Sequence, residues 1–282
     1  GEEEAGSPHL ARMLDRHRAL LGGADAWIMV DGPRHPSGLR QVVFGVRGDV
    51  NVDLTVYGAT RPLHSGHYGN WAPNPAMQLA QLLASMKDRS GRVRIAGWSD
   101  DVVPLGAEEL AAIREAPTPD SALRVELGLG GGFVGDAGPG ASAAGPTVAT
   151  LAEAINLPSL NVNGMRSGDV GAAARNVIPT TASAVLDLRL VQGNDVRRQV
   201  DRLVQHVRGQ GYHVIDREPT AAERARFFPI ATVTVRPGGY NAERTAMNHP
   251  VARAVVAALR EMDPAPLVRV PTLGGSLPLV TF

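Results

Sequence analysis

Two stretches of this sequence place an apolar residue or glycine at every second position, and this pattern limits the fold more than any other feature. The first runs through residues 46–56 and the second through 182–190. A period of two over this length predicts strands with one buried and one half-exposed face. Amphipathic helical patterns follow at 75–86 and 196–207, after Asn74 and Asn194, which we expect to cap them. The sequence therefore predicts a sheet with helices packed on one face.

The alternation of strands and helices divides the sequence into three parts. Residues 47–238 read strand–helix–strand twice around an irregular segment at 104–158, which is typical of a small α+β domain with a single sheet. The flanking residues 1–46 and 239–282 have α/β character. This order favours an α+β domain inserted into an α/β domain.

Shorter patterns predict the remaining elements. They are helices at 8–21, 107–116 and 250–262, strands at 26–31, 91–95, 159–162, 212–215, 230–235, 268–270 and 277–282, and a Gly-rich loop at 128–146. The strand at 26–31 is expected to be buried and to end at Asp31. In open α/β sheets, ligand groups gather at the C-terminal ends of strands.

Composition excludes several classes of protein. The chain has 28 basic and 28 acidic side chains, so it lacks the basic surplus of a nucleic-acid-binding protein. It has no cysteine, which excludes disulfides, thiolate metal sites and a cysteine nucleophile. No apolar run reaches the roughly 18 residues that span a membrane, and no signal peptide is recognisable. We therefore expect a cytoplasmic protein without nucleic-acid or membrane partners.

Carboxylates occur in two places that suit metal binding. Glu2, Glu3 and Glu4 are adjacent and precede a Gly-Ser pair, so they repel one another unless a cation lies among them. Acidic residues ahead of a helix also interact well with its dipole, and this simpler interpretation stays open. Asp31 is either a ligand at its strand end or a turn residue ahead of Gly-Pro.

Three further segments could contact a substrate. His64 and Ser65 are adjacent in a polar loop, but adjacent residues do not form a catalytic dyad by spacing alone, and no G-x-S-x-G sequence occurs. Arg189 lies within a strand, where it either faces solvent or binds a carboxylate through two hydrogen bonds. Gly275 and Ser276 form either a tight turn or a backbone that can approach an anion.

Taken in order along the chain, these segments resemble the M20 family of zinc metallopeptidases, and within it the carnosinase-like dipeptidases. The resemblance extends from the first residue to the last and rests on Gly1–Ser7, Asp31–Pro33, Leu63–Gly69, Asn74-Pro75, Asn176–Pro179, Asp187–Leu190 and Gly274–Pro278. It implies a catalytic α/β domain that holds two zinc ions and an inserted lid domain that also mediates dimerisation. This implied architecture agrees with the insertion inferred above.

The resemblance also implies roles for the polar residues near the metal. Glu3 corresponds to the general base that activates water, and Glu4 to a zinc ligand, with Glu2 as the alternative by one position. Asp31 corresponds to a carboxylate bound to one zinc ion. His64 corresponds to the lid histidine that reaches into the active site of the partner subunit and stabilises the oxyanion.

The remaining matches concern the substrate. Arg189 corresponds to the arginine that binds the substrate carboxylate, while Asn176, Gly275 and Ser276 fall at substrate-contacting positions. We therefore expect a homodimeric peptidase that hydrolyses dipeptides or similar small substrates with two zinc ions per complete site, or with other divalent metals.

One departure limits this expectation. The family also uses a His-x-Asp motif upstream of the Glu pair and a His downstream of the Gly-Gly-Ser segment, and neither is recognisable here. We therefore expect a partial chain, consisting of the lid and fragments of the catalytic domain, which does not hydrolyse peptides by itself. A dimerisation module without catalysis, and a deacylase or deacetylase of the same family, are the alternatives.

Overall fold

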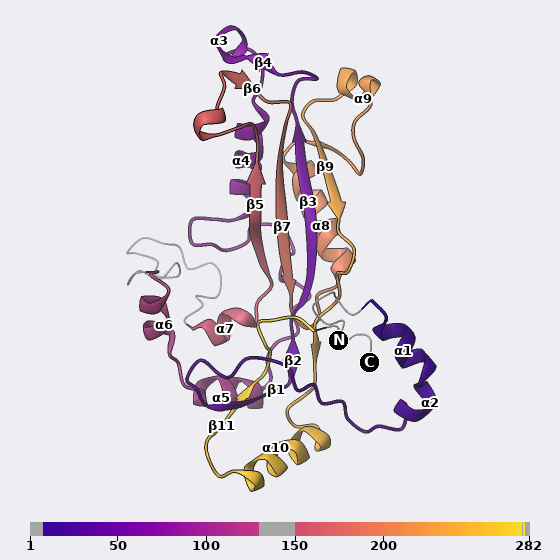
Figure 1. Cartoon of the computed structure of the whole chain (residues 1–282), viewed down its shortest axis with the longest axis vertical. Helices are drawn as coiled ribbons and strands as arrows, with labels where there is room; N and C mark the ends of the chain where they lie inside the picture. Colours follow the sequence, from indigo (N-terminus) through magenta and orange to yellow (C-terminus); the bar gives the residue numbers. More distant parts are fainter. Residues whose placement is uncertain (1–7, 130–149, 278, 280–282) are drawn as a thin grey trace.

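The computed structural model of the chain describes residues 8–129, 150–277 and 279. Its largest element is a five-stranded sheet, which runs vertically in Figure 1. The strands in spatial order are β5 (Ser159–Arg166), β7 (Thr181–Leu190), β3 (Gly48–Tyr57), β9 (Ile230–Val235) and β8 (His213–Ile215). Neighbours are antiparallel except for β8 and β9, which are parallel.

The two alternating stretches of the sequence form the centre of this sheet. Strands β3 and β7 pair without a register break over ten residues each, from Gly48 opposite Leu190 to Tyr57 opposite Thr181. Burial along β3 alternates at every position, because successive side chains point to opposite faces of a strand. The apolar set faces the helices, and the polar set lies on the other face. The predicted single sheet with helices on one face is confirmed.

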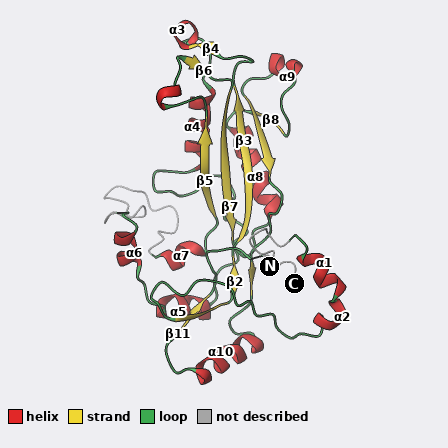
Figure 2. Cartoon of the chain, in the orientation of Figure 1, coloured by secondary structure: helices red, strands yellow, loops and turns green. Residues whose placement is uncertain are grey.

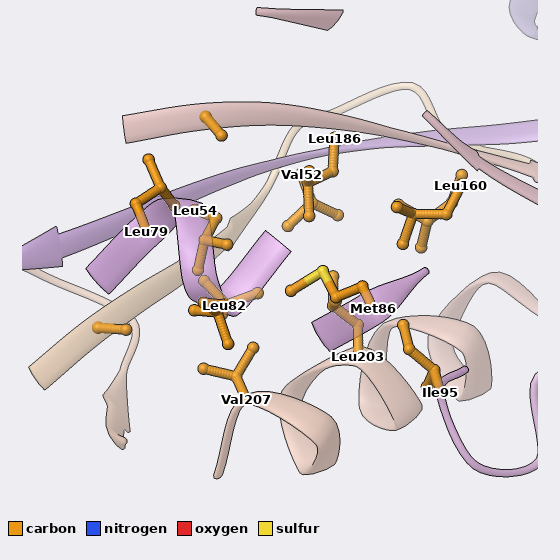
Figure 3. Close-up of a cluster of buried hydrophobic side chains, with 14 of the residues drawn as sticks. Val52, Leu54, Leu79, Leu82, Met86, Ile95, Leu160, Leu186, Leu203 and Val207 are labelled. Carbon is orange, nitrogen blue, oxygen red and sulfur yellow. The ribbon is translucent and has the colours of Figure 1, made fainter. Parts of the chain in front are cut away.

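Helices α4 (Pro75–Met86) and α8 (Val196–Gly209) cover the apolar face of the sheet and form the main core with it. Figure 3 shows side chains from both helices and from three strands meeting there. The residues labelled are Val52, Leu54, Leu79, Leu82, Met86, Ile95, Leu160, Leu186, Leu203 and Val207. Burying each of these side chains stabilises the fold by about 1.5–3 kcal/mol before entropy is counted.

The N-cap residue agrees with the prediction for helix α4 but not for helix α8. Asn74 caps α4 as predicted, since its side-chain oxygen accepts a hydrogen bond from the amide of Ala76 at 2.9 Å. Helix α8 is capped by Asp195, not by Asn194 as predicted, and the Asp195 carboxylate accepts from the amide of Arg198. The Asn194 side chain accepts instead from the amide of Val191, so it closes the preceding turn.

A second, smaller set of elements packs below the sheet in Figure 1. Strand β1 (Arg40–Val43) pairs in parallel with β11 (Leu267–Val270), and β2 (Gly45–Val46) pairs antiparallel with β10 (Glu243–Arg244). Helices α5 (Ala107–Glu115) and α10 (Pro250–Met262) pack beside them. Phe44, Ala112, Met247 and Ala252 form their shared core. Helix α5 comes from the segment at 104–158, so part of that segment packs with the flanking residues.

The remaining elements are short and are coloured by type in Figure 2. They are α1 (Leu10–Arg16), α2 (Arg18–Leu21), β4 (Leu63–His64), α3 (Ser65–Tyr68), α6 (Asp120–Glu126), α7 (Leu151–Ile155), the 3₁₀ helix η2 (Gly171–Ala173), β6 (Val177–Ile178) and α9 (Ala221–Arg226). Within the described ranges, no helix is both long and apolar enough to cross a membrane.

Two predicted strands are wrong. Residues 26–31 have no strand geometry and are exposed, with Val30 at 99%. A buried strand needs neighbours to bind its backbone N–H and C=O groups, and no described strand pairs with this run. Residues 91–95 contribute only one bridge, between Val93 and Lys87. The Gly-rich loop at 128–146 and the strand at 277–282 lie largely outside the described residues.

Candidate functional site

The predicted site residues fall into two groups at opposite ends of the sheet. Arg189, Gly275 and Ser276 lie at the end that joins the smaller set of elements, which we call the base. His64 and Asn176 lie at the other end, which we call the tip, with α3, β4 and β6 (Figure 1). Glu3 and Glu4 lie outside the described residues.

At the base, charged and polar side chains from four segments meet on the polar side of the sheet. One comes from the residue before β3, one from the start of β3, two from β7, one from the chain that follows β9, and one from the chain that follows β11. We call this group the base cluster; its members are Arg47, Asp49, Asp187, Arg189, Tyr240 and Ser276. Two of its charges are positive and two are negative.

Arg189 is the centre of the base cluster. Its Nε donates to the Asp187 carboxylate at 3.0 Å, and its Nη1 donates to the Ser276 hydroxyl at 2.9 Å. Its Nη2 has no hydrogen-bond partner within the described part of the chain. The side chain is 30% exposed, so part of it is accessible to a small molecule. An arginine held in this way suits the binding of a carboxylate.

The ionisation of the base cluster reflects its burial. Burial raises the pKa of the Asp49 carboxyl; Arg189 opposes this rise and Asp187 adds to it. Burial and the positive charge of Arg189 lower the pKa of Arg47 to about 10, while Asp187 acts in the opposite direction. Burial and the nearby Asp49 raise the pKa of Tyr240. The charges therefore act on one another in a poorly solvated place.

Backbone contacts place the Gly275-Ser276 segment against the sheet. The amide of Arg47 donates to the carbonyl of Gly275 at 3.3 Å, and the amide of Leu273 donates to the carbonyl of Gly45 at 2.7 Å. The segment therefore runs beside β2, where Ser276 meets Arg189. The structure thus brings together Arg189 and the Gly275-Ser276 pair, which the sequence placed in two separate motifs.

At the tip, His64 begins the short helix α3 and is exposed. Its Nδ1 accepts a hydrogen bond from the amide of Gly66 at 3.1 Å. A neutral imidazole that accepts at Nδ1 carries its proton on Nε2, so Nε2 is a donor. The carbonyl of Asn176 accepts from the amide of Ser65 at 3.0 Å, which fastens this loop to the chain before β6. His64 and His67 also contact each other, with ring centroids 4.9 Å apart.

The two groups are too far apart to act on one small substrate within one chain. Strands β3 and β7 connect the base to the tip over ten residues each. At a rise of about 3.3 Å per residue, this length corresponds to roughly 30 Å. His64 and Arg189 of one chain therefore do not form a single site.

Among the described residues, no group of three His, Cys, Asp or Glu side chains is placed to hold a metal ion. Asp31 lies in exposed coil. Its neighbour Gly32 approaches the chain that precedes Gly275, because a Cβ added to Gly32 would lie 3.8 Å from the Leu273 side chain. A single carboxylate holds zinc weakly, so the described residues alone do not fit a zinc site.

Sequence reasoning missed four members of the base cluster. Asp187 had a recognisable signal, because it lies two residues before Arg189 and residues two apart share one face of a strand. No sequence signal pointed to the other three members, Arg47, Asp49 and Tyr240. Their place in the cluster depends on the pairing of Asp49 with Tyr240, which joins two segments far apart in the sequence.

Comparison with known proteins gives the family. The model of the M20 peptidase dimerisation domain matches residues 44–214, which include most of the sheet and helices α4 and α8. The sequence is 24% identical over 212 residues to human Beta-Ala-His dipeptidase and 24% identical over 211 residues to the Cys-Gly metallodipeptidase DUG1 of Saccharomyces cerevisiae. These alignments include 73% of this chain and 39% and 41% of the relatives, so the chain spans about two fifths of their length.

Solved structures agree with this assignment. An M20 metallo-carboxypeptidase from Sulfolobus solfataricus matches all of this chain and 58% of its own, with a TM-score of 0.73 and 26% identity. Human carnosine dipeptidase 1 matches 99% of this chain and 54% of its own, with a TM-score of 0.71 and 19% identity. The predicted fold class is confirmed. The chain therefore belongs to the M20 peptidase family, and its residues 44–214 form the family's dimerisation domain.

Proposed function

We propose that this chain supplies the lid and parts of the catalytic domain of a metal-dependent peptidase that cleaves dipeptides or similar small substrates. The observation that carries the proposal is the fixed and partly exposed guanidinium of Arg189, whose Nη2 has no hydrogen-bond partner among the described residues and can donate to a carboxylate. Two relatives are dipeptidases by name, and the M20 structure from Sulfolobus solfataricus is a metallo-carboxypeptidase. Substrates of both kinds end in a free carboxylate.

We further propose that residues 47–238 are the lid domain and that residues 1–46 and 239–282 are the catalytic-domain fragments. The two separate cores support this division. Helix α5 is the exception, because Arg269 of β11 forms ion pairs with Glu108 and Glu115 of that helix. The irregular segment at 104–158 is thus a lid insertion whose first helix returns to the catalytic fragments.

The roles at the tip require a second subunit in this proposal. His64 has a donor at Nε2 and lies far from Arg189 of its own chain. In a homodimer joined through the lid, His64 and Asn176 of one protomer serve the site at the base of the other. Exposed apolar side chains around α4 and the end of β5 supply a surface for this association; they are Trp71, Met77, Met165 and Val170.

Sedimentation equilibrium tests the dimer. We expect the wild-type chain to be a dimer and Met165→Asp to raise its dissociation constant at least about tenfold, because a charge then has to be desolvated at the interface. Met262→Asp is the matched control, since Met262 is also exposed, at 81% against 55% for Met165, but lies at the end of α10, near the base. A monomeric wild-type chain, or equal weakening by both substitutions, contradicts the proposed surface.

The metal cofactor is proposed because the chain belongs to a family of metallopeptidases. Zinc, with other divalent metals as substitutes, is the expected cofactor, and Glu4 and Asp31 are the expected ligands with Glu3 as base. Because the His-x-Asp motif that the family resemblance implies does not occur among these 282 residues, the chain by itself is expected not to hydrolyse β-alanyl-histidine with zinc present. Turnover by the purified chain under these conditions contradicts this expectation.

Ligand binding tests the role of Arg189. Calorimetric titration compares β-alanyl-histidine with its C-terminal amide, which lacks the carboxylate. We expect the wild-type chain to prefer the acid and Arg189→Ala to weaken binding of the acid about tenfold or more, with little effect on the amide. If Arg189→Ala weakens both ligands equally, the carboxylate role fails, and a deacylase of the same family becomes the better proposal.

A further inference from the structure

Asp187 is a buried carboxylate whose hydrogen bonds are incomplete. The residue is 8% exposed, and it lies two positions before Arg189 on the same face of β7. Its Oδ2 accepts from Nε of Arg189, whereas its Oδ1 is buried and has no hydrogen-bond partner in the described ranges. An unsatisfied buried carboxylate oxygen destabilises a fold, so stability alone does not account for an aspartate here.

The guanidinium of Arg189 is held from two directions. Asp187 fixes it from within the lid sheet, and Ser276 fixes it from the chain that follows β11. The Ser276 side chain also acts on the Tyr240 hydroxyl, whose pKa it lowers against the larger opposing effect of burial. With Nε and Nη1 occupied, Nη2 is the nitrogen left for a ligand.

Two further charged residues, Arg47 and Asp49, face Arg189. They show why Asp187 is the main counter-charge of the guanidinium. Arg47 is buried and donates to the carbonyl of Leu157 and the hydroxyl of Ser159, so its positive charge stays close to Arg189. Asp49 lies directly opposite Arg189 on β3. Among the described residues, the ion pair of Arg189 is with Asp187 and not with Asp49. Asp187 is the anion in direct contact with the guanidinium.

We propose that Asp187 is a positioning residue, which holds the guanidinium of Arg189 through Nε so that Nη2 points to the carboxylate of the substrate. Ser276 completes the arrangement through Nη1. This inference rests on the proposed carboxylate-binding role of Arg189. It adds the residue that orients the arginine before the substrate arrives, which lowers the entropy lost on binding.

Two readouts test the inference, and the first needs no ligand. In ¹⁵N NMR spectra, the Nε–H signal of Arg189, assigned by its loss in Arg189→Lys, is expected to exchange slowly with water. Asp187→Ala is expected to speed this exchange at least about tenfold, because the acceptor at Nε is removed. Asp187→Asn keeps an oxygen acceptor and is expected to restore slow exchange in part.

The second readout is the preference for β-alanyl-histidine over its C-terminal amide. We expect Asp187→Ala to reduce this preference about tenfold, and Asp187→Asn to reduce it less. The matched control is Asp53→Ala, which removes a carboxylate paired with Arg236 on the same face of the sheet, away from the base cluster. It is expected to change neither the preference nor the exchange at Arg189.

The outcomes separate this inference from the proposed function. If Arg189→Ala abolishes the preference but both Asp187 variants keep wild-type preference and exchange, the positioning role is overturned and the proposed function stands. If the wild-type chain shows no preference, the proposed function fails, and the exchange of Nε–H alone decides whether Asp187 holds the guanidinium. If Asp187→Ala does not fold, Asp187→Asn decides, with unchanged preference and exchange counting against the inference.

Discussion

The base and the tip of the sheet each carry residues that are candidates for contacting a substrate, but the two ends hold these residues in different ways. At the base, Arg189 is fixed through its side chain by Asp187 and Ser276 and lies among other buried charges. At the tip, the loop of His64 is fastened through its backbone, and the imidazole is exposed. The base thus holds its charged side chains within its own chain, while the tip leaves its imidazole exposed.

The largest expected difference between the two ends concerns stability. Arg47→Ala at the base is expected to lower the free energy of unfolding by about 3 kcal/mol, because it removes one member of a buried ion cluster. His64→Ala at the tip is expected to change it by less than about 0.5 kcal/mol. Urea unfolding followed by circular dichroism measures both.

Arg236→Ala is the control for this pair, since Arg236 is a more exposed arginine that pairs with Asp53 on the same sheet. Arg236→Ala is expected to lower the free energy of unfolding by less than about 1 kcal/mol. A loss at His64 or Arg236 equal to that at Arg47 contradicts the contrast between base and tip.

A pair of glycines sharpens the same comparison. A Cβ added to Gly48 at the base would lie 2.6 Å from the backbone nitrogen of Ala242, which cannot move without disturbing the sheet. A Cβ added to Gly66 at the tip meets only the ring of His64, at 3.0 Å. Thermal unfolding is expected to show a cost of about 2 kcal/mol for Gly48→Ala and a change within about 1 kcal/mol for Gly66→Ala. Equal costs mean that the tip backbone is packed as tightly as the base.

The smallest expected effect depends on pH. Because the pKa of Asp49 is raised in the folded chain, the unfolded chain releases this proton first as the pH rises. The contribution of Asp49 to stability is therefore full below its ordinary pKa near 4 and falls as the pH rises to the folded pKa. Asp49→Asn is expected to raise the free energy of unfolding at pH 7 by less than about 1 kcal/mol, since solvent screens this half-buried group.

Asp169→Asn is the control at the tip end, where Asp169 forms an exposed pair with Arg175. It is expected to change the free energy of unfolding by less than about 0.5 kcal/mol, as measured by urea unfolding. A steeper loss of stability with rising pH in Asp49→Asn than in the wild type contradicts the assigned sign.

The parts of the fold that could be predicted are those whose signal is local. The alternation in β3 and β7 specifies both their strand geometry and their buried face, and the Asn-Pro pair before α4 specifies its first residue. The run at 26–31 was predicted wrongly because apolarity indicates burial only where a partner strand exists. Whether Asn194 or Asp195 caps α8 depends on which carbonyls and amides the turn leaves unpaired, and both residue types cap well.

The candidate site was predictable only in pieces. The motif around Arg189 pointed to a carboxylate, and the Gly275-Ser276 segment pointed to an anion, but no local pattern joined them. Arg47 and Tyr240 enter the base cluster through strand pairing between residues far apart in the sequence. The role proposed for His64 came from the family resemblance, and under that proposal the length of β3 requires a second protomer.

The unbroken register of β3 and β7 also has a mechanical consequence. Strands β3 and β7 together extend about 30 Å from the base to the tip. A rotation of roughly 10° at the base therefore displaces the far end by about 5 Å. A small rotation of the sheet about the base is thereby amplified at His64. A small rotation at the base therefore moves the tip by a distance comparable to the length of a peptide unit.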